Sequence, residues 1–253
     1  GSTEVGRRLE EACAATLKRT SMELGGNAPF IVFEDADIDA AVEGALISKY
    51  RNSGQTCVCT NRILVQESIH DAFVAKLVAA TADLKMGNGL EDGVQQGPLV
   101  NAGAVQDVDQ LVQLSVEAGA QVALGGARSE LGPCYYQPTV LTAVTPDMAV
   151  FRHEIFGPVA PVMSFTNEAE AISLANDTEF GLASYFYTRD IGRVWRVSEA
   201  LDYGMVGVNE GIISNEMAPF GGVKASGSGR EGSKYGIDDY LEIKYILMGG
   251  LDR

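Results

Sequence analysis

The chain has 253 residues, of which 46% are hydrophobic, so it can bury a sizeable core in one large domain or two modest ones. Its formal net charge of −15 argues against nucleic acid and anionic membranes as partners, because both bind basic patches. Four cysteines are too few for a disulfide scaffold, and neither a signal peptide nor an apolar run long enough to span a membrane is recognisable, so we expect a reducing, cytoplasmic compartment.

Helices and strands are predicted to alternate along the chain. Apolar spacing predicts helices over residues 4–18, 35–50, 69–84, 104–118, 168–175 and 191–200. Short apolar runs between turn residues predict strands over residues 29–33, 62–66, 121–124, 136–141, 159–165, 183–187 and 204–208. This order predicts an α/β fold with a mainly parallel sheet. A glycine-rich loop, a short helix and an apolar strand over residues 240–248 are expected to follow, and that strand needs a partner.

The first motif with chemical content is Glu23-Leu24-Gly25-Gly26. It ends an apparent strand, Met22–Leu24, and strand ends of α/β sheets commonly host ligands. The two glycines let a backbone and a ligand approach closely. A partly desolvated glutamate has a raised pKa and can take a proton from water or a thiol. Glu23 is therefore a candidate base, the alternative being an ordinary surface glutamate.

The second motif, residues 52–59, places Cys57 after Gly54-Gln55-Thr56, where backbone amides can point at a reacting group. The N–H of Cys57 itself can stabilise the oxyanion of an attacked aldehyde. A nucleophilic thiolate needs local positive potential, and Arg51 is a candidate for that role or for binding an anionic substrate. The alternative is a buried, inert cysteine. Together, a thiol and a carboxylate in such settings predict covalent chemistry on a carbonyl.

Cys59 lies two residues after Cys57 and allows two interpretations. Packing is one, and a reversible Cys57–Cys59 disulfide that acts as a redox switch is the other. A zinc site is not supported, because a Cys-x-Cys pair with only His70 and His153 elsewhere does not match zinc-ligand spacing. We therefore predict no metal.

Two further segments are rich in turn residues. Glu154-Ile155-Phe156-Gly157-Pro158 is either a loop whose ring fills the core or a carboxylate and ring that contact ribose hydroxyls and a flat cofactor. Residues 227–232 fit the pattern G-x-G-x-x-G, but no strand precedes them and no βαβ unit follows. We interpret this segment as a loop bordering a substrate site, not as a dinucleotide fingerprint.

Taken together, these motifs resemble the aldehyde dehydrogenase superfamily. The resemblance rests on Glu-Leu-Gly-Gly at 23–26, Gly-Gln-Thr-Cys at 54–57, Glu-Ile-Phe-Gly-Pro at 154–158 and Pro-Phe-Gly-Gly-x-Lys-x-Ser-Gly at 219–227, which occur in the family's order over the whole chain. The Cys-Val-Cys loop, Arg51, residues 209–215 and the segment from Gly229 look most like the succinate-semialdehyde dehydrogenase subfamily.

The resemblance implies a mechanism and a set of site residues. Cys57 would attack the aldehyde, hydride transfer to NAD or NADP would leave a thioester, and Glu23 would activate water to hydrolyse it. The implied cofactor contacts are Ser2, Leu24, Gly25, Glu154 and Phe156. The implied contacts to the distal carboxylate of succinic semialdehyde are Arg51, Ser214 and Asn215. Members of the family pair through C-terminal strands, so a homo-oligomer, a dimer or a tetramer, is expected.

The resemblance also implies that family members are roughly twice this long. We therefore expect a remnant of the cofactor domain at 1–22, a catalytic domain at 23–228, and a C-terminal helix with an oligomerisation strand at 229–253. On this hypothesis the chain alone binds its cofactor weakly, has little dehydrogenase activity and associates through exposed apolar surface. The alternatives are an aldehyde dehydrogenase for another aldehyde, or a non-catalytic oligomerising fragment.

Overall fold

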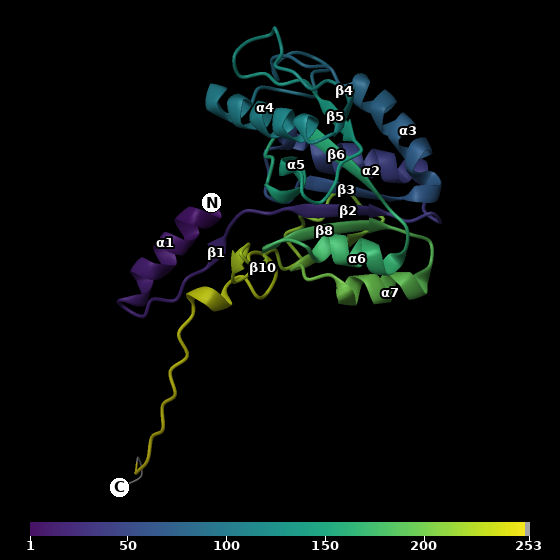
Figure 1. The fold of residues 1–253 in the computed structure, drawn as a ribbon. Coiled ribbons are helices and arrows are strands. Elements are labelled where there is room, and N and C mark those ends of the chain that lie inside the picture. The colour runs from purple at the N-terminus through teal and green to yellow at the C-terminus, as the bar shows by residue number, and fades with distance from the viewer. Residues whose placement is uncertain (251–253) are drawn as a thin grey trace.

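The computed structural model describes residues 1–250, and its centre is a seven-stranded sheet with the order β4-β5-β6-β3-β2-β8-β9 (Figure 1). All neighbouring strands are parallel except the edge pair β4 and β5, which is antiparallel. The strands are β2 (Ala28–Val32), β3 (Thr60–Gln66), β4 (Gln121–Leu124), β5 (Thr139–Thr142), β6 (Val159–Phe165), β8 (Ala183–Tyr187) and β9 (Met205–Val208). The predicted α/β fold with a mainly parallel sheet is confirmed.

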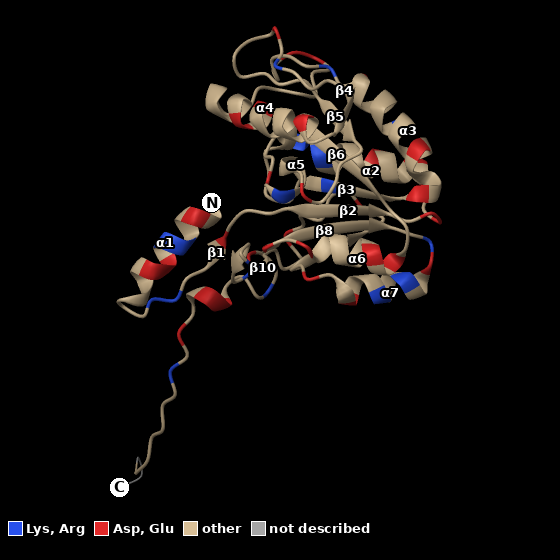
Figure 2. Ribbon diagram, viewed as in Figure 1, with Lys and Arg blue, Asp and Glu red and all other residues tan. Residues whose placement is uncertain are grey.

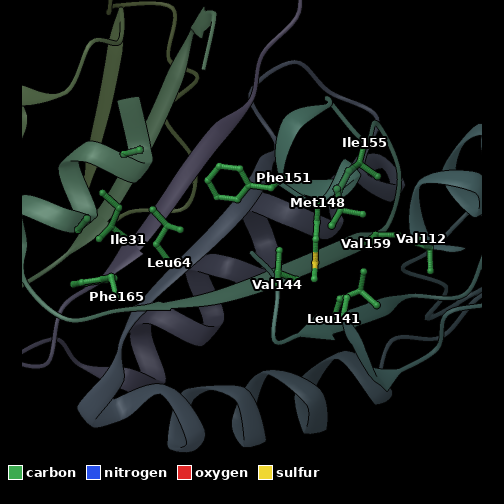
Figure 3. Close-up of a cluster of buried hydrophobic side chains, with 14 of the residues drawn as sticks. Ile31, Leu64, Val112, Leu141, Val144, Met148, Phe151, Ile155, Val159 and Phe165 are labelled. Carbon is green, nitrogen blue, oxygen red and sulfur yellow. The ribbon is translucent and has the colours of Figure 1, made fainter. Parts of the chain in front are cut away.

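Helices cover both faces of this sheet. One face packs on α2 (Ile38–Tyr50) and α3 (His70–Ala82), and the other packs on α4 (Ala102–Glu117), α5 (Ala149–Arg152), α6 (Glu168–Asn176) and α7 (Ile191–Ala200). Because side chains alternate along a strand, Phe30 faces α2 and α3, whereas its neighbour Ile31 faces the other layer. Figure 3 shows this second cluster, in which Ile31, Leu64, Phe151 and Phe165 are labelled. None of the described helices is long and apolar enough to cross a membrane.

A buried arginine joins the sheet to the end of α6. Arg62 in β3 is 1% exposed, and its guanidinium donates to the carbonyl oxygens of Asn27, Leu174 and Ala175 and to the hydroxyl of Tyr203. The last carbonyls of a helix lack partners within the helix, so this side chain satisfies two of them at the C-terminal end of α6.

Two small antiparallel ribbons and the first helix lie outside the main sheet. Helix α1 (Thr3–Ala14) stands apart from it, β1 (Met22–Glu23) pairs with β11 (Gly227–Ser228), and β10 (Val223–Lys224) pairs with β7 (Phe180–Gly181). The strand predicted at Met22–Leu24 is present as Met22–Glu23, but it lies in one of these ribbons and not in the main sheet. Three 3-10 turns, Arg51–Gly54, Glu67–Ile69 and Asp238–Tyr240, complete the described elements.

The C-terminal segment differs from its prediction. The short helix expected there is a single 3-10 turn, and residues 241–250 extend away from the body without pairing with any described strand (Figure 1). The strand predicted over 240–248 was wrong for the single chain, because a strand needs a partner for its backbone hydrogen bonds. The segment is mostly uncharged (Figure 2), and its apolar side chains, Ile243, Tyr245, Ile246, Leu247 and Met248, are exposed. Residues 251–253 of the expected C-terminal unit lie outside the described residues.

Candidate active site

The motifs singled out in the sequence meet at the amino ends of adjacent strands. Gly25 and Gly26 come just before β2, Cys57 just before β3, and Glu154 just before β6, and these three strands lie side by side in the sheet. In open α/β sheets, ligands usually bind at the carboxyl ends of the strands. Here the loops that lead into the strands of the main sheet gather these motifs, and Glu23 ends the short strand β1.

One cavity collects five of the eleven predicted site residues. It has a volume of about 610 Å³ and is lined by Gly1, Ser2, Gly25, Gln55, Thr56, Cys57, Glu154 and Phe156. The structure thus brings the candidate nucleophile together with four of the five residues expected to contact a cofactor.

A strained turn presents Cys57 to this cavity. Asn52, Ser53 and Gly54 have φ values of 52°, 55° and 78°, and such left-handed residues cost about 1–2 kcal/mol each when they are not glycine. The Ser53 hydroxyl holds the turn by donating to the carbonyl oxygen of Gly97 at 3.0 Å. A Cβ at residue 54 would lie 2.1 Å from the carbonyl oxygen of Gly157, so only glycine lets the two loops touch.

Burial and two nearby carboxylates raise the pKa of the Cys57 thiol. Burial has the largest effect on this half-buried group, Glu23 and Glu154 add to it, and a hydrogen bond from the backbone of Cys57 opposes them. The role of Arg51 as a source of positive potential at this thiol stays a prediction. The resting thiol is protonated at neutral pH, so its reaction requires a base.

Glu154 has one oxygen fixed and one uncommitted. The N–H of Gly26 donates to Oε1 at 2.9 Å, while Oε2 has no hydrogen bond to any described residue. Burial raises the pKa of Glu154 to about 7, opposed by the Gly26 hydrogen bond and by the buried Lys49. A Cβ on Gly25 would lie 3.0 Å from Oε2, so glycine keeps this approach open. With the exposed ring of Phe156 nearby, these groups fit a nucleoside that offers hydroxyls and a flat ring.

Glu23 lies beside the glycine-rich loop. Both of its carboxylate oxygens are buried, and neither has a hydrogen-bond partner among the described residues. Burial raises the pKa of Glu23 to about 7, Glu231 raises it further, and Arg230 opposes them. A Cβ on Gly221 would lie 3.1 Å from Oε1, and strand pairing places Glu23 opposite Gly227, the first residue of the segment expected to border a substrate site. A carboxyl group with a pKa near neutrality can accept and return protons. Arg230 and Glu231 were not predicted as its neighbours, because they lie about two hundred residues away along the chain.

Two other predicted residues lie outside the cavity. Leu24 packs against Gly6 of α1 and lines a separate hollow of about 510 Å³. Cys59 is buried, its Sγ lies 2.7 Å from the Thr56 hydroxyl, and it is a free thiol like Cys57. The structure therefore shows the packed form of Cys59.

The predicted carboxylate-binding residues are not joined by any described contact. Arg51 is half-buried at the end of α2 and has no ion pair with a described residue. Ser214 and Asn215 are exposed on the loop that follows β9. The same loop packs on α2, since a Cβ on Gly211 would lie 2.3 Å from the carbonyl oxygen of Gly44. Arg51 ends the helix on which this loop packs.

Comparisons with known proteins agree in sequence and in fold. The profile of the aldehyde dehydrogenase family matches residues 1–246. The chain is 62% identical over 251 residues to a glutarate-semialdehyde dehydrogenase of Pseudomonas aeruginosa, covering 99% of this chain and 52% of that protein. It is 59% identical over 249 residues to an NADP⁺ succinate-semialdehyde dehydrogenase of Escherichia coli, covering 98% and 52%.

A solved structure also matches this chain over about half of its own length. The succinate-semialdehyde dehydrogenase from Burkholderia pseudomallei superposes with a TM-score of 0.96 at 61% identity, over 97% of this chain and 51% of that one. The chain therefore spans about half the length of the curated relatives it matches.

Proposed function

The chain belongs to the aldehyde dehydrogenase family, and on that premise we propose that it carries the nucleophile and base of an NAD(P)-dependent semialdehyde dehydrogenase. The observation that carries this proposal is the cavity in which the Cys57 thiol meets Glu154 and Phe156. The nearby Glu23 carboxylate, whose oxygens are buried and unpartnered within residues 1–250, supports it.

The first step forms a carbon–sulfur bond. The thiol proton passes to Glu23, directly or through water, and the Cys57 sulfur adds to the aldehyde carbon. The carbonyl electron pair moves to oxygen, and we assign the backbone N–H of Cys57 as a donor to this oxyanion. The product on the enzyme is a thiohemiacetal.

The second half of the reaction releases an acid. When bound, NAD or NADP would supply the hydride acceptor, and loss of hydride from the thiohemiacetal anion would leave a thioester on Cys57. We propose that Glu154, Phe156, Ser2 at the start of α1 and Gly25 hold this cofactor in the cavity, and that Leu24 contacts it from the adjoining hollow. Glu23 first releases the thiol proton to solvent. It then takes a proton from water, the hydroxide adds to the thioester carbon, and the carbon–sulfur bond breaks; the acid that forms gives its proton to the thiolate, which leaves a carboxylate and the free thiol.

We propose that the substrate carries a second, distal carboxylate. The guanidinium of Arg51 suits such a group, because its planar fork can bind both oxygens, and Ser214 and Asn215 offer additional polar contacts. Succinic semialdehyde is our first candidate. Glutaric semialdehyde, which is one methylene longer, is the second, and a relative that acts on it is 62% identical to this chain.

Protection of Cys57 by aldehydes tests the proposal without a cofactor. Reversible addition of the aldehyde blocks alkylation, so Cys57 labelling by iodoacetamide is followed by peptide mass spectrometry while aldehyde is titrated in. Succinic semialdehyde should protect Cys57 at concentrations at least about tenfold below those of butanal, because a buried ionic hydrogen bond contributes about 1.5–3 kcal/mol. Glutaric semialdehyde in the same assay ranks the two acids.

The variant Arg51→Gln separates anion recognition from the thiol chemistry. It should abolish the preference for succinic semialdehyde and leave protection by butanal unchanged. Equal losses for both aldehydes would contradict the role of Arg51. If no aldehyde protects Cys57 more than Cys13 or Cys134, the chain is a non-catalytic fragment and the proposed function fails.

A further inference from the structure

A pair of buried amides lies behind the cavity, and neither belongs to the motifs discussed so far. Asn61 stands four residues after Cys57 at the start of β3 and is 3% exposed. Its Nδ2 donates to the carbonyl oxygen of His153 at 2.8 Å, and its Oδ1 accepts the N–H of Ile155 at 3.0 Å. One side chain thus binds the backbone on both sides of Glu154.

The second amide stands in an equivalent place on the neighbouring loop. Asn27 follows Gly26 by one residue, is 1% exposed, and accepts a hydrogen bond at Oδ1 from Nδ2 of Asn61 at 2.7 Å. Its own Nδ2 donates to the carbonyl oxygen of Phe151 at 3.1 Å and to the hydroxyl of Thr178 at 3.3 Å. The Asn27–Asn61 pair therefore connects the three loops that carry Glu23, Cys57 and Glu154.

We propose that the Asn27–Asn61 pair is a positioning device that fixes the carboxylate of Glu154 relative to the Cys57 thiol. The inference rests on the proposed function, which assigns cofactor binding to Glu154 and the nucleophile to Cys57. Asn61 continues directly from the Cys57 loop, and Asn27 continues directly from Gly26, whose N–H binds Glu154 Oε1. The pair thus links the loop that carries the thiol to the residue whose N–H holds the carboxylate of Glu154.

The hydrogen-bond accounting favours this specific role over general packing. Four hydrogen bonds join the two side chains to each other or to backbone, and each of them connects two of three segments: the one before and at the start of β2, the start of β3, and the segment from α5 to Ile155. Buried amides with all partners satisfied rigidify their surroundings, and removing one leaves polar groups unpaired. Loss of Asn61 should release the backbone that flanks Glu154, while the sheet below remains.

The pH dependence of Cys57 alkylation tests the proposal in the intact chain. The charged groups that act on this thiol are Glu23, Glu154 and the amino group of Gly1. Because Glu154 raises the pKa of Cys57 from its fixed position, the variant Asn61→Ala should lower the midpoint of the alkylation profile. The expected shift is a few tenths of a pH unit, which makes labelling about two- to threefold faster near neutral pH.

A double-mutant cycle shows whether Asn61 acts through Glu154. The variant Glu154→Gln should lower the midpoint by itself, and adding Asn61→Ala to it should cause little further shift. Fully additive shifts would overturn the proposal. If Asn61→Ala does not fold, Asn61→Ser, which retains a small polar group, replaces it in the same cycle.

Asn176→Ala is the matched control for lost stability. Asn176 also binds the backbone on two sides, since it donates to the carbonyl oxygen of Ala200 at 2.8 Å and accepts the N–H of Asp202 at 3.0 Å, at the end of α6. Both alanine variants should unfold at lower urea concentrations, but only Asn61→Ala should move the alkylation midpoint. An unchanged midpoint in Asn61→Ala would reduce the pair to a structural role. This comparison needs no aldehyde, so it is independent of the protection assay.

Discussion

At the scale of single residues, the buried carboxyl of Glu23 couples the candidate site to the stability of the chain. Its pKa of about 7 in the folded chain lies well above the ordinary value of 4.5. Between these values the folded chain keeps a proton that the unfolded chain has released. The free energy of unfolding therefore falls as the pH rises from about 4.5 to about 7.

The variant Glu23→Gln removes this dependence. After a discount for partial exposure, we expect it to increase the free energy of unfolding by about 1–2 kcal/mol at pH 8 and to leave it nearly unchanged at pH 4. Urea unfolding at both pH values measures the difference. Glu199→Gln, a change at an exposed position, is the control. An equal gain at both pH values would show that burial of an ionised Glu23 is not the cause.

The sequence predicted the site residues whose roles depend on their neighbours in the chain. It did not predict the roles that depend on residues far away in the chain. Cys57, Gly25 and Glu154 sit in short motifs, and the structure gathers them around one cavity. The effect of Glu154 on the pKa of the thiol could not be predicted, because Glu154 lies almost a hundred residues away along the chain and only the fold brings its charge close. The roles of Asn27 and Asn61 could not be predicted from the sequence, because the role of a buried amide depends on the hydrogen-bond partners that the fold brings to it.

At the scale of elements, the hydrophobic pattern predicted the bounds of several longer strands and helices. It failed for short elements that form only by pairing with a distant segment. Strands β4, β6 and β8 and helix α7 have the predicted bounds. A strand at Met22–Leu24 was predicted, but its two-residue partner β11 was not, because their pairing joins segments about two hundred residues apart. The first helix ends at Ala14, short of the predicted residue 18, where Leu17 adopts a left-handed conformation.

The junction between β3 and α6 gives a prediction at this scale. Arg62→Lys keeps the charge but loses the planar fork that reaches Asn27, Leu174 and Ala175 together. The buried carbonyls left without a donor should lower the free energy of unfolding by about 2–4 kcal/mol, measured by urea denaturation.

Arg128→Lys is the matched control, because Arg128 pairs with Asp109 in an exposed setting. A pair of that kind contributes at most about 1 kcal/mol, so this variant should change stability little. Similar effects of the two substitutions would contradict the role assigned to Arg62 at the end of α6.

At the scale of the whole molecule, residues 241–250 are the part that the fold leaves uncovered. Their apolar side chains are exposed, and they make no strand with any described residue. We propose that a second copy of the chain pairs with this segment in a homo-oligomer. We also propose that the chain divides into a remnant of the cofactor domain at residues 1–22, a catalytic domain at 23–228 and a C-terminal unit at 229–253.

Removal of residues 241–253 tests this pairing. The shortened chain should keep its unfolding midpoint, because the segment lies away from both hydrophobic clusters, but it should associate less. Light scattering after size-exclusion chromatography measures the mass of the particles. A full-length chain that is monomeric at high concentration, or a shortened chain that associates equally, would contradict the proposal.

The position of the cavity at the amino ends of the strands bears on how such a protein can diversify. The thiol, Glu154 and the two glycines are anchored to the beginnings of three buried strands, whereas Arg51 ends α2 and the loop of Ser214 packs on that helix. Selection can therefore lengthen, shorten or recharge the surface proposed to bind the far end of a substrate while the reacting atoms keep their places. New metabolic roles would arise at the rim of such a protein, on an inherited and nearly unaltered chemical centre.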